Sequence, residues 1–269
     1  MIAHTQKWVA AGIFYVACAG MTQADDQAPH NNNDSPWSLE FEMGIENEPA
    51  YTGSDVYLTE PSLNVELAYE GRGGHTYFVS LGELGIDWAL GEQRSLSTLL
   101  EYEFGRDNAD DSALTEFPVF KNTVEVQAVY RQQFGNTGLG IGIQYDVLDR
   151  GKGLVGFIGV DYRRMVNPRF ALQAQIDLSF ADAEHMQTEV GISPGTAEST
   201  GLNAYEAASG YKGASVGLGL QYAVTNRWML KAQIALEHYG SIMADSPLIR
   251  DEGSATNVET GIGVSYEFW

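Results

Sequence analysis

Cysteine is almost missing from this chain of 269 residues, which contains a single one, Cys18. Cys18 lies in an apolar segment near the N-terminus that we expect to be removed, so the mature protein would hold no thiol. A disulfide framework, a thiolate metal site and a cysteine nucleophile are therefore excluded.

Positive charge is also scarce, with 15 Lys and Arg residues against 36 Asp and Glu residues and a formal net charge of −21. Without Lys7, which lies in the segment expected to be removed, 14 basic residues remain and the net charge becomes −22. A chain this acidic repels phosphate backbones, so we expect no nucleic-acid partner.

Long hydrophobic runs are missing too, because no run of roughly 18 apolar residues, the length that marks a membrane helix, follows Ala24. The other structure that satisfies every backbone group in lipid is a closed β-barrel. Any insertion into a membrane must therefore be as a barrel.

The N-terminus has the features of a secretory signal peptide. Lys7 supplies the positive charge, residues 8–20 are apolar, and Thr22-Gln23-Ala24 offers a cleavage site with small residues at its ends. The apolar run is too short to span a bilayer as a helix. We expect residues 1–24 to be cleaved, residues 25–36 to form a flexible periplasmic tail, and residues 37–269 to form one barrel.

The rest of the chain is dominated by alternation of apolar and polar residues. In residues 258–268, even-numbered positions are mostly apolar or aromatic, whereas odd-numbered positions are polar or glycine. The first set contains Val258, Ile262, Val264, Tyr266 and Phe268, and the second contains Glu259, Gly261, Gly263, Ser265 and Glu267. A period of two predicts a strand with one face toward lipid and the other toward a wet lumen. A charge facing lipid costs a few kcal/mol near the midplane, so the carboxylates mark the lumen side.

About twelve such segments follow one another, within limits of about ten and fourteen. Between them, short turns contrast with three long irregular segments, residues 106–121, 181–213 and 240–254, and residues 195–201 favour a short helix. We predict an all-β fold, an antiparallel transmembrane β-barrel in the outer membrane of a Gram-negative bacterium. Its partners would be outer-membrane lipids and the barrel-assembly machinery.

Seven charged residues on the inward parity are candidates for lining the lumen: Glu101, Glu103, Glu125, Arg131, Asp146, Asp177 and Lys231. They could form a cation-selective lining, or they could solvate the lumen and pair with one another. A barrel of this size is small enough to be filled by its own side chains, which favours the second interpretation.

Enzymatic and metal-binding patterns are weak. His238 and Ser241 lie close together at a strand end, as in outer-membrane lipid hydrolases, but the sequence fixes no acidic partner for them. The histidines His75, His185 and His238 fall in separate segments without ligand spacing. We expect no catalytic, cofactor-binding or metal-binding site, and no enzyme.

Distinctive loop motifs resemble those of a known family. Residues 190–212 read VGISPGTAESTGLNAYEAASGYK, and ADSPLIR, GSATN and the terminal GIGVSYEF follow. Near the front, residues 49–55 read PAYTGSD, similar to a P-x-Y-x-G-S element. Over nearly the whole mature chain, the sequence resembles the family of the MltA-interacting protein and the outer-membrane protein OmpV.

This resemblance implies a barrel that serves as a scaffold linking a murein transglycosylase and a murein synthase to the outer membrane. Other members are porin-like, so a channel for small solutes, with a preference for cations, is the alternative. The family pattern ends on phenylalanine, whereas Trp269 follows Phe268 here; Tyr266, Phe268 and Trp269 are the candidate C-terminal assembly signal.

The loop motifs contain the residues that we would test first, which are Pro49, Tyr51, Gly53, Ser54, Asp245, Ser246 and Pro247. One interpretation is local turn architecture, with Gly53 at an unusual backbone angle and side-chain caps before Pro247. The other is protein docking or gating of the lumen. The sequence leaves both open.

Overall fold

The computed structural model describes residues 35–106, 108 and 111–268. The expected signal peptide and nearly all of the expected tail lie outside the described residues. No helix in the described part is both long and apolar enough to cross a membrane.

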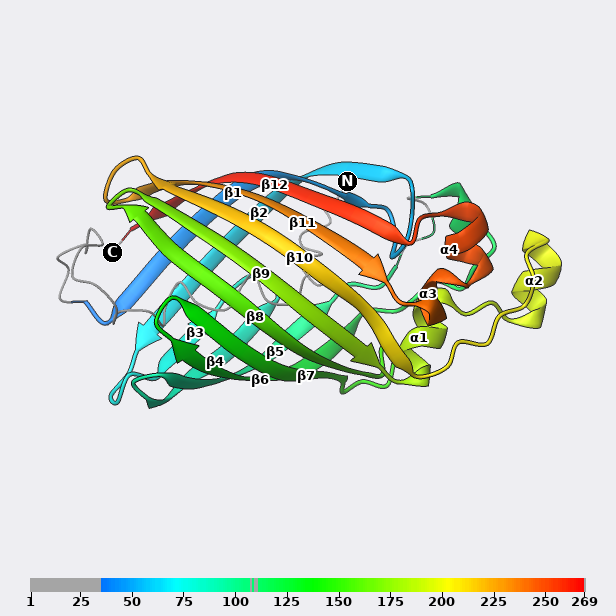
Figure 1. Cartoon of the computed structure of the whole chain (residues 1–269), viewed down its shortest axis with the longest axis horizontal. Coiled ribbons are helices and arrows are strands. Elements are labelled where there is room, and N and C mark those ends of the chain that lie inside the picture. Colours follow the sequence, from blue (N-terminus) through cyan, green and yellow to red (C-terminus); the bar gives the residue numbers. More distant parts are fainter. Residues whose placement is uncertain (1–34, 107, 109–110, 269) are drawn as a thin grey trace.

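Twelve strands follow one another around a closed barrel, each antiparallel to the next, and the first pairs with the last (Figure 1). This confirms the predicted antiparallel barrel of about twelve strands. The strands are β1 (Trp37–Pro49), β2 (Tyr57–Glu70), β3 (Thr76–Val79), β4 (Glu83–Gly91), β5 (Arg94–Glu103), β6 (Thr123–Phe134), β7 (Thr137–Asp146), β8 (Leu154–Asn167), β9 (Phe170–Ala181), β10 (Gly210–Ala223), β11 (Trp228–Tyr239) and β12 (Thr256–Glu267).

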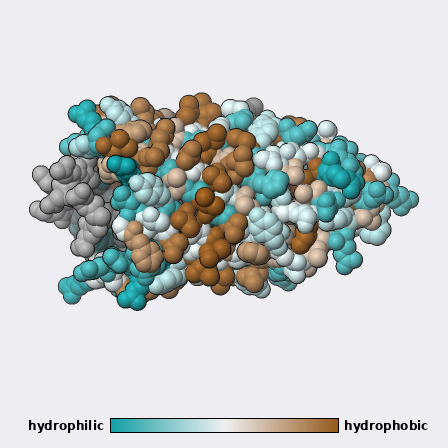
Figure 2. All heavy atoms as spheres, viewed as in Figure 1, coloured by the Kyte–Doolittle hydropathy of each residue, from teal (hydrophilic) through white to brown (hydrophobic). Residues whose placement is uncertain are grey.

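Alternation along the strands separates the two faces of the wall. Ile176 is 56% exposed on the outside, while its neighbours Gln175 and Asp177 are 6% and 9% exposed toward the lumen. Hydrophobic residues gather over the strands, and hydrophilic ones gather at the end that carries the helices (Figure 2). The outside of the wall is therefore apolar, as a lipid-facing surface must be.

The two ends of the barrel differ in the length of their connections. At the end here called the turn end, residues 71–75, 92–93, 135–136, 168–169 and 224–227 join the strands. At the opposite loop end, the connections include residues 104–122, 182–209 and 240–255. Outer-membrane barrels place short turns in the periplasm and long loops outside the cell, so the loop end is extracellular.

The long loops fold into a cap over the loop end (Figure 1). The cap contains α1 (Ala183–Val190), α2 (Pro194–Thr200), α3 (Ser241–Ala244), α4 (Pro247–Glu252) and a 3-10 helix, η2 (Ser112–Leu114). Two hydrophobic clusters hold it together; the first includes Met186, Val190, Tyr239 and Met243, and the second includes Tyr51, Leu114, Phe117, Ile192 and Leu248. The predicted helix at residues 195–201 corresponds to α2, shifted by one residue.

One part of the barrel wall is incompletely hydrogen-bonded. β2 pairs with β3 only through residues 67–70, and no other described strand pairs with that edge along residues 57–66. Ala50 N donates to Val56 O, so even-numbered residues of β2 bond to β1 and odd-numbered ones face the uncovered edge. Pro61 therefore stands where its missing N–H would face that edge, and proline is one of the ways in which proteins protect edge strands.

Candidate functional site

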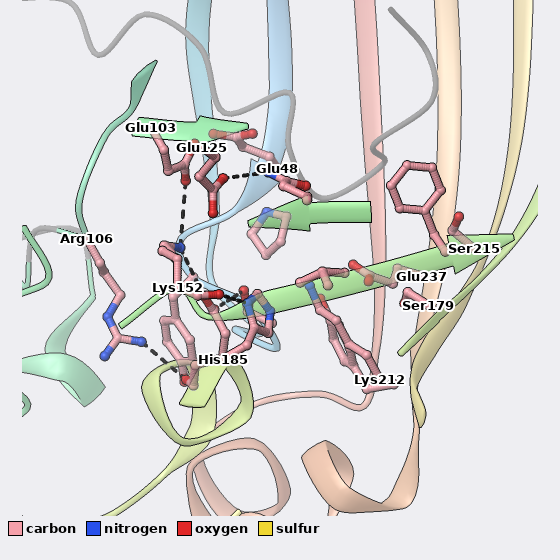
Figure 3. A pocket seen from close by; sticks show the side chains of 18 of the residues that line it. Glu48, Glu103, Arg106, Glu125, Lys152, Ser179, His185, Lys212, Ser215 and Glu237 are labelled. Atoms are coloured by element: carbon pink, nitrogen blue, oxygen red, sulfur yellow. Dashed lines mark hydrogen bonds and ion pairs between the residues drawn. The ribbon is translucent and has the colours of Figure 1, made fainter. Parts of the chain in front are cut away.

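A cavity of about 160 Å³ lies inside the barrel directly beneath the cap. Its walls come from the ends of the strands, from α1 and from the loops at this end of the barrel (Figure 3). Among the described residues, seven carboxylates and three permanent cations line it; the acids are Glu48, Glu103, Glu125, Asp177, Glu189, Glu237 and Glu259, and the bases are Arg106, Lys152 and Lys212.

Lys152 and Glu189 form the central ion pair of the cavity, with Lys152 Nζ 3.0 Å from Glu189 Oε1 and 3.7 Å from Glu103 Oε1. Burial alone would raise the pKa of Glu189, but Lys152 and the other nearby cations outweigh it and hold that pKa well below its usual range. Burial lowers the pKa of Lys152, and Glu189 and Glu103 more than reverse this and raise it. Both groups therefore stay charged.

Backbone geometry in the β7–β8 loop places Lys152 over the cavity. Asp146 Oδ2 accepts hydrogen bonds from the N–H groups of Arg150 and Lys152, which folds the loop back over the end of β7. Gly153 follows with φ of +54°, and a side chain there would collide with Asp182. The loop can turn inward at Lys152 because glycine at position 153 adopts this positive φ without steric strain.

His185 lines the same cavity from α1 and is 6% exposed. Its Nδ1 lies 2.8 Å from the carbonyl oxygen of Lys152, so Nδ1 carries the proton and donates it. Burial, together with the charge of Lys212, lowers the pKa of His185 to about 4, and the ring is therefore neutral at physiological pH. Nε2 consequently offers a lone pair, and it has no hydrogen-bond partner among the described residues.

Arg106 closes the cavity on another side. Its Nη1 donates to Glu189 O near the C-terminus of α1 at 3.4 Å, and its guanidinium carbon lies 3.9 Å from the centre of the Phe120 ring. Both contacts suit a cation, because the end of a helix and the face of an aromatic ring are electronegative. Burial lowers the pKa of Arg106 to about 10, which still leaves it charged at neutral pH.

The two loop motifs singled out in the sequence meet in the cap. Tyr51 OH donates to Glu252 O at 3.2 Å, and Asn257 Nδ2 donates to Ser54 O at 2.8 Å. Gly53 has φ of +85°, and a Cβ atom at this position would lie 2.7 Å from the side chain of Ile249. These contacts join the β1–β2 connection to the β11–β12 connection.

Other motif residues also make contacts within the cap. Ser246 Oγ donates to Val190 O at 2.6 Å and caps α4, whose first residue is the buried Pro247. Asp245 is the residue after α3, and Pro49 is the last residue of β1 and lines the cavity. Tyr51, Gly53, Ser54 and Ser246 therefore hold the loops of the cap to one another.

The structure brings only some of the candidate lumen residues together. Glu103, Glu125 and Asp177 line the cavity, whereas Asp146 holds the β7–β8 loop. Lys231 lies toward the turn end and binds Glu40 and Glu42 at 2.6 Å each. Arg131 forms an ion pair with Asp161 at 3.3 Å. Glu101 stands opposite Glu125 in the β5–β6 ladder and so lies beside the cavity.

At the turn end, aromatic residues surround the end of the chain. Tyr266 packs against Trp228 and Phe268 with ring centres 4.7 and 4.8 Å apart, and Phe268 N donates to Leu39 O. Trp269, the other residue of the candidate assembly signal, lies outside the described residues.

Sequence reasoning missed the importance of Arg106, Lys152, Glu189 and Lys212. All four lie in turns or irregular segments where alternation gives no parity, so nothing assigned them to the lumen. His185 was considered only as a metal ligand. The available signal was the N-cap residue, since Asp182 is a residue type that favours the start of a helix, and Asp182 Oδ1 does accept from His185 N.

The turn end carries exposed arginines, here called the arginine rim: Arg72, Arg94, Arg164, Arg169 and Arg227. Only a few acidic residues, such as Glu70 and Glu92, are exposed in the same turns. In a chain with an overall net charge of −21, this end stands out as basic.

A closed barrel with an apolar outer face, a polar lumen, short turns at one end and a folded cap at the other defines an outer-membrane β-barrel protein of a Gram-negative bacterium. The family model of the MltA-interacting protein MipA matches residues 43–268, and the chain belongs to this family. This confirms the resemblance seen in the loop motifs. A search of curated proteins gives no match.

Among solved structures, the chain is similar to the translocator domain of the autotransporter NalP from Neisseria meningitidis. The identity is 14%, the TM-score is 0.52, and the match covers 88% of this chain and 90% of that one. It is also similar to the NanC porin, with 12% identity, a TM-score of 0.46, and coverage of 85% and 98%. These similarities concern the fold alone.

Proposed function

We propose that this protein is a non-enzymatic scaffold that holds a murein transglycosylase and a murein synthase at the periplasmic face of the outer membrane. The observation that carries the proposal is the contrast between its two ends. The extracellular end is closed by a folded cap, while the periplasmic end presents the arginine rim.

The cap argues against an open pore because it has its own hydrophobic core. Leu114, Met186, Met243 and Leu248 are all 0% exposed. Fully burying a side chain of this kind stabilises a protein by about 1.5–3 kcal/mol, so moving the cap aside would lose several such contributions at once. The proposed resting state is therefore closed to solutes.

The arginine rim supports the choice of partner. Arginine forms bidentate hydrogen bonds with carboxylates, and murein stem peptides and acidic protein surfaces both present carboxylates. The family takes its name from an interaction with a protein called MltA, which is consistent with a partner on the periplasmic side.

The experiment is capture of murein-hydrolysing activity from an envelope extract by the purified barrel. In the rim variant, Arg164, Arg169 and Arg227 are changed to Glu. In the charge-matched control, the exposed loop-end residues Lys121, Arg150 and Arg250 are changed to Glu. We expect the rim variant to lose most of the captured activity and the control to retain it.

Equal capture by both variants, or none by the unchanged protein, would overturn the scaffold proposal. Planar bilayers provide the second readout. We expect no conductance steps from the purified protein, whereas stepwise cation-selective conductance would favour the alternative, a channel for small solutes.

A further inference from the structure

We propose that the cavity beneath the cap is a binding site for a small organic cation with N–H donors, of the primary amine class. This site is distinct from the arginine rim and does not depend on the scaffold proposal. The argument rests on the charge of the lining, on unpartnered acceptor atoms, and on the size and composition of the walls.

The net negative charge of the lining repels an anion and attracts a cation. In the described part of the chain, seven lining carboxylates face three permanent cations, and two of those cations already have partners. Lys152 is shared between Glu189 and Glu103, while Arg106 is engaged by the end of α1 and the Phe120 ring. The excess of negative charge in a partly enclosed site attracts a positively charged ligand.

Two buried acceptor atoms in the lining lack donors among the described residues. They are Nε2 of His185, which is 6% exposed, and Oδ1 of Asp177, which is 9% exposed. Native proteins pair nearly all of their buried polar atoms, so each such atom calls for a donor. A protonated amine supplies three donors and no acceptor, which matches both atoms. Nε of Arg106, a buried donor without a hydrogen-bond partner, would suit a ligand that also carries a neutral oxygen.

The lining also includes aromatic residues, among them Phe157 and Tyr239. Aromatic faces attract organic cations through cation–π contacts, and they pack well against methylene groups. A metal ion is a poorer match, because no group of three or more His, Cys, Asp or Glu residues in the described part is arranged to hold one.

The volume sets the size of the ligand. A cavity of about 150 Å³ is large enough for benzene, which has six heavy atoms, and the cavity here is of about 160 Å³. A linear diamine with four methylene groups has the same number of heavy atoms. We therefore choose 1,4-diaminobutane as the probe.

The test is titration calorimetry on the folded protein in detergent. We expect saturable binding of 1,4-diaminobutane to one site, and no binding of the neutral 1,4-butanediol or of succinate. Asp177→Asn replaces an acceptor with a donor and removes a charge, so it should weaken binding at least about tenfold, as the loss of a charge-assisted hydrogen bond does. The matched control is Glu66→Gln, a lumen carboxylate outside the cavity lining.

Folding of each variant is checked by its heat-modifiable migration on SDS gels. His185→Asn, which removes the Nε2 acceptor, provides a second variant should Asp177→Asn fail to fold. Absence of saturable diamine binding to the folded unchanged protein would overturn the proposal. So would binding that the diol matches, or that Glu66→Gln weakens as much as the cavity variants do.

Discussion

At the scale of single residues, the cap end of the barrel depends on groups whose charge states are set by burial. Glu189 and Lys152 stay charged because each compensates the other, whereas His185 stays neutral because it is buried and because a third cation beside Lys152 and Lys212 would be unfavourable. The neutral state of His185 makes the stability of the protein depend on pH.

The pH dependence follows from the pKa of His185, which is about 4 in the folded protein and about 6.5 in an unfolded chain. As the pH falls below about 6.5, the unfolded chain takes up the proton first, so folding loses free energy until the pH approaches 4. The loss amounts to about 3 kcal/mol. Above pH 6.5, the contribution of His185 is constant.

His185→Asn tests this account, because asparagine can still donate to Lys152 O and does not titrate. We expect the free energy of unfolding of the unchanged protein to fall more steeply between pH 6.5 and 4 than that of the variant. Denaturant titrations in detergent over this range measure both profiles. Parallel profiles would show that His185 has the same pKa in the folded and the unfolded protein, and would contradict this account.

None of these residue pairings could be predicted from the sequence. Lys152 and Glu189 lie in two different loops, 37 residues apart, and their contact depends on how the cap folds. Alternation identified Glu103, Glu125 and Asp177 as inward-facing, since they lie on strands. It could not say that they share a cavity with Lys152, because parity gives the side of the wall but not the contacts across the lumen.

At the scale of elements, the strands and α2 are predictable from the sequence, and the other helices of the cap are not. Each strand is long enough for its alternation between lipid and lumen to be read directly. In contrast, α1, α3 and α4 are only 8, 4 and 6 residues long, too short to show a periodicity. They depend on side-chain caps and on contacts between loops, such as Ser246 with Val190.

Gly53 provides a test of these contacts between loops, with Gly201 as a matched control. Both have a positive φ, +85° and +78°, so alanine is strained by about 1 kcal/mol at either position. At Gly53, the added Cβ would also meet Ile249 at 2.7 Å, whereas at Gly201 nothing lies within 4 Å. We expect Gly53→Ala to loosen the cap more than Gly201→Ala does.

Limited proteolysis of the folded barrel measures this difference. Cleavage in residues 240–255 should be faster in Gly53→Ala than in Gly201→Ala, with the strands protected in both. Similar cleavage rates for the two variants would contradict the packing of Gly53 against α4.

At the scale of the whole molecule, the barrel is asymmetric along its axis. The loop end is acidic and is closed by the folded cap. The turn end has short connections, aromatic side chains and exposed arginines. The sequence predicts the barrel and its insertion in a membrane, because both follow from the alternation and from the absence of long apolar runs. The existence of a closed cap follows from the structure alone, since its core is assembled from four connections distant in sequence.

The central claim is that alternate residues along the strands face lipid and lumen. Since the only cysteine lies at position 18, single-cysteine variants of a chain that begins at residue 25 need no background substitutions. A fluorophore attached at Leu100→Cys or Ile176→Cys should be quenched by brominated acyl chains, and one at Glu101→Cys or Gln175→Cys should not. Quenching of the second pair instead of the first, or equal quenching of all four, would contradict the account.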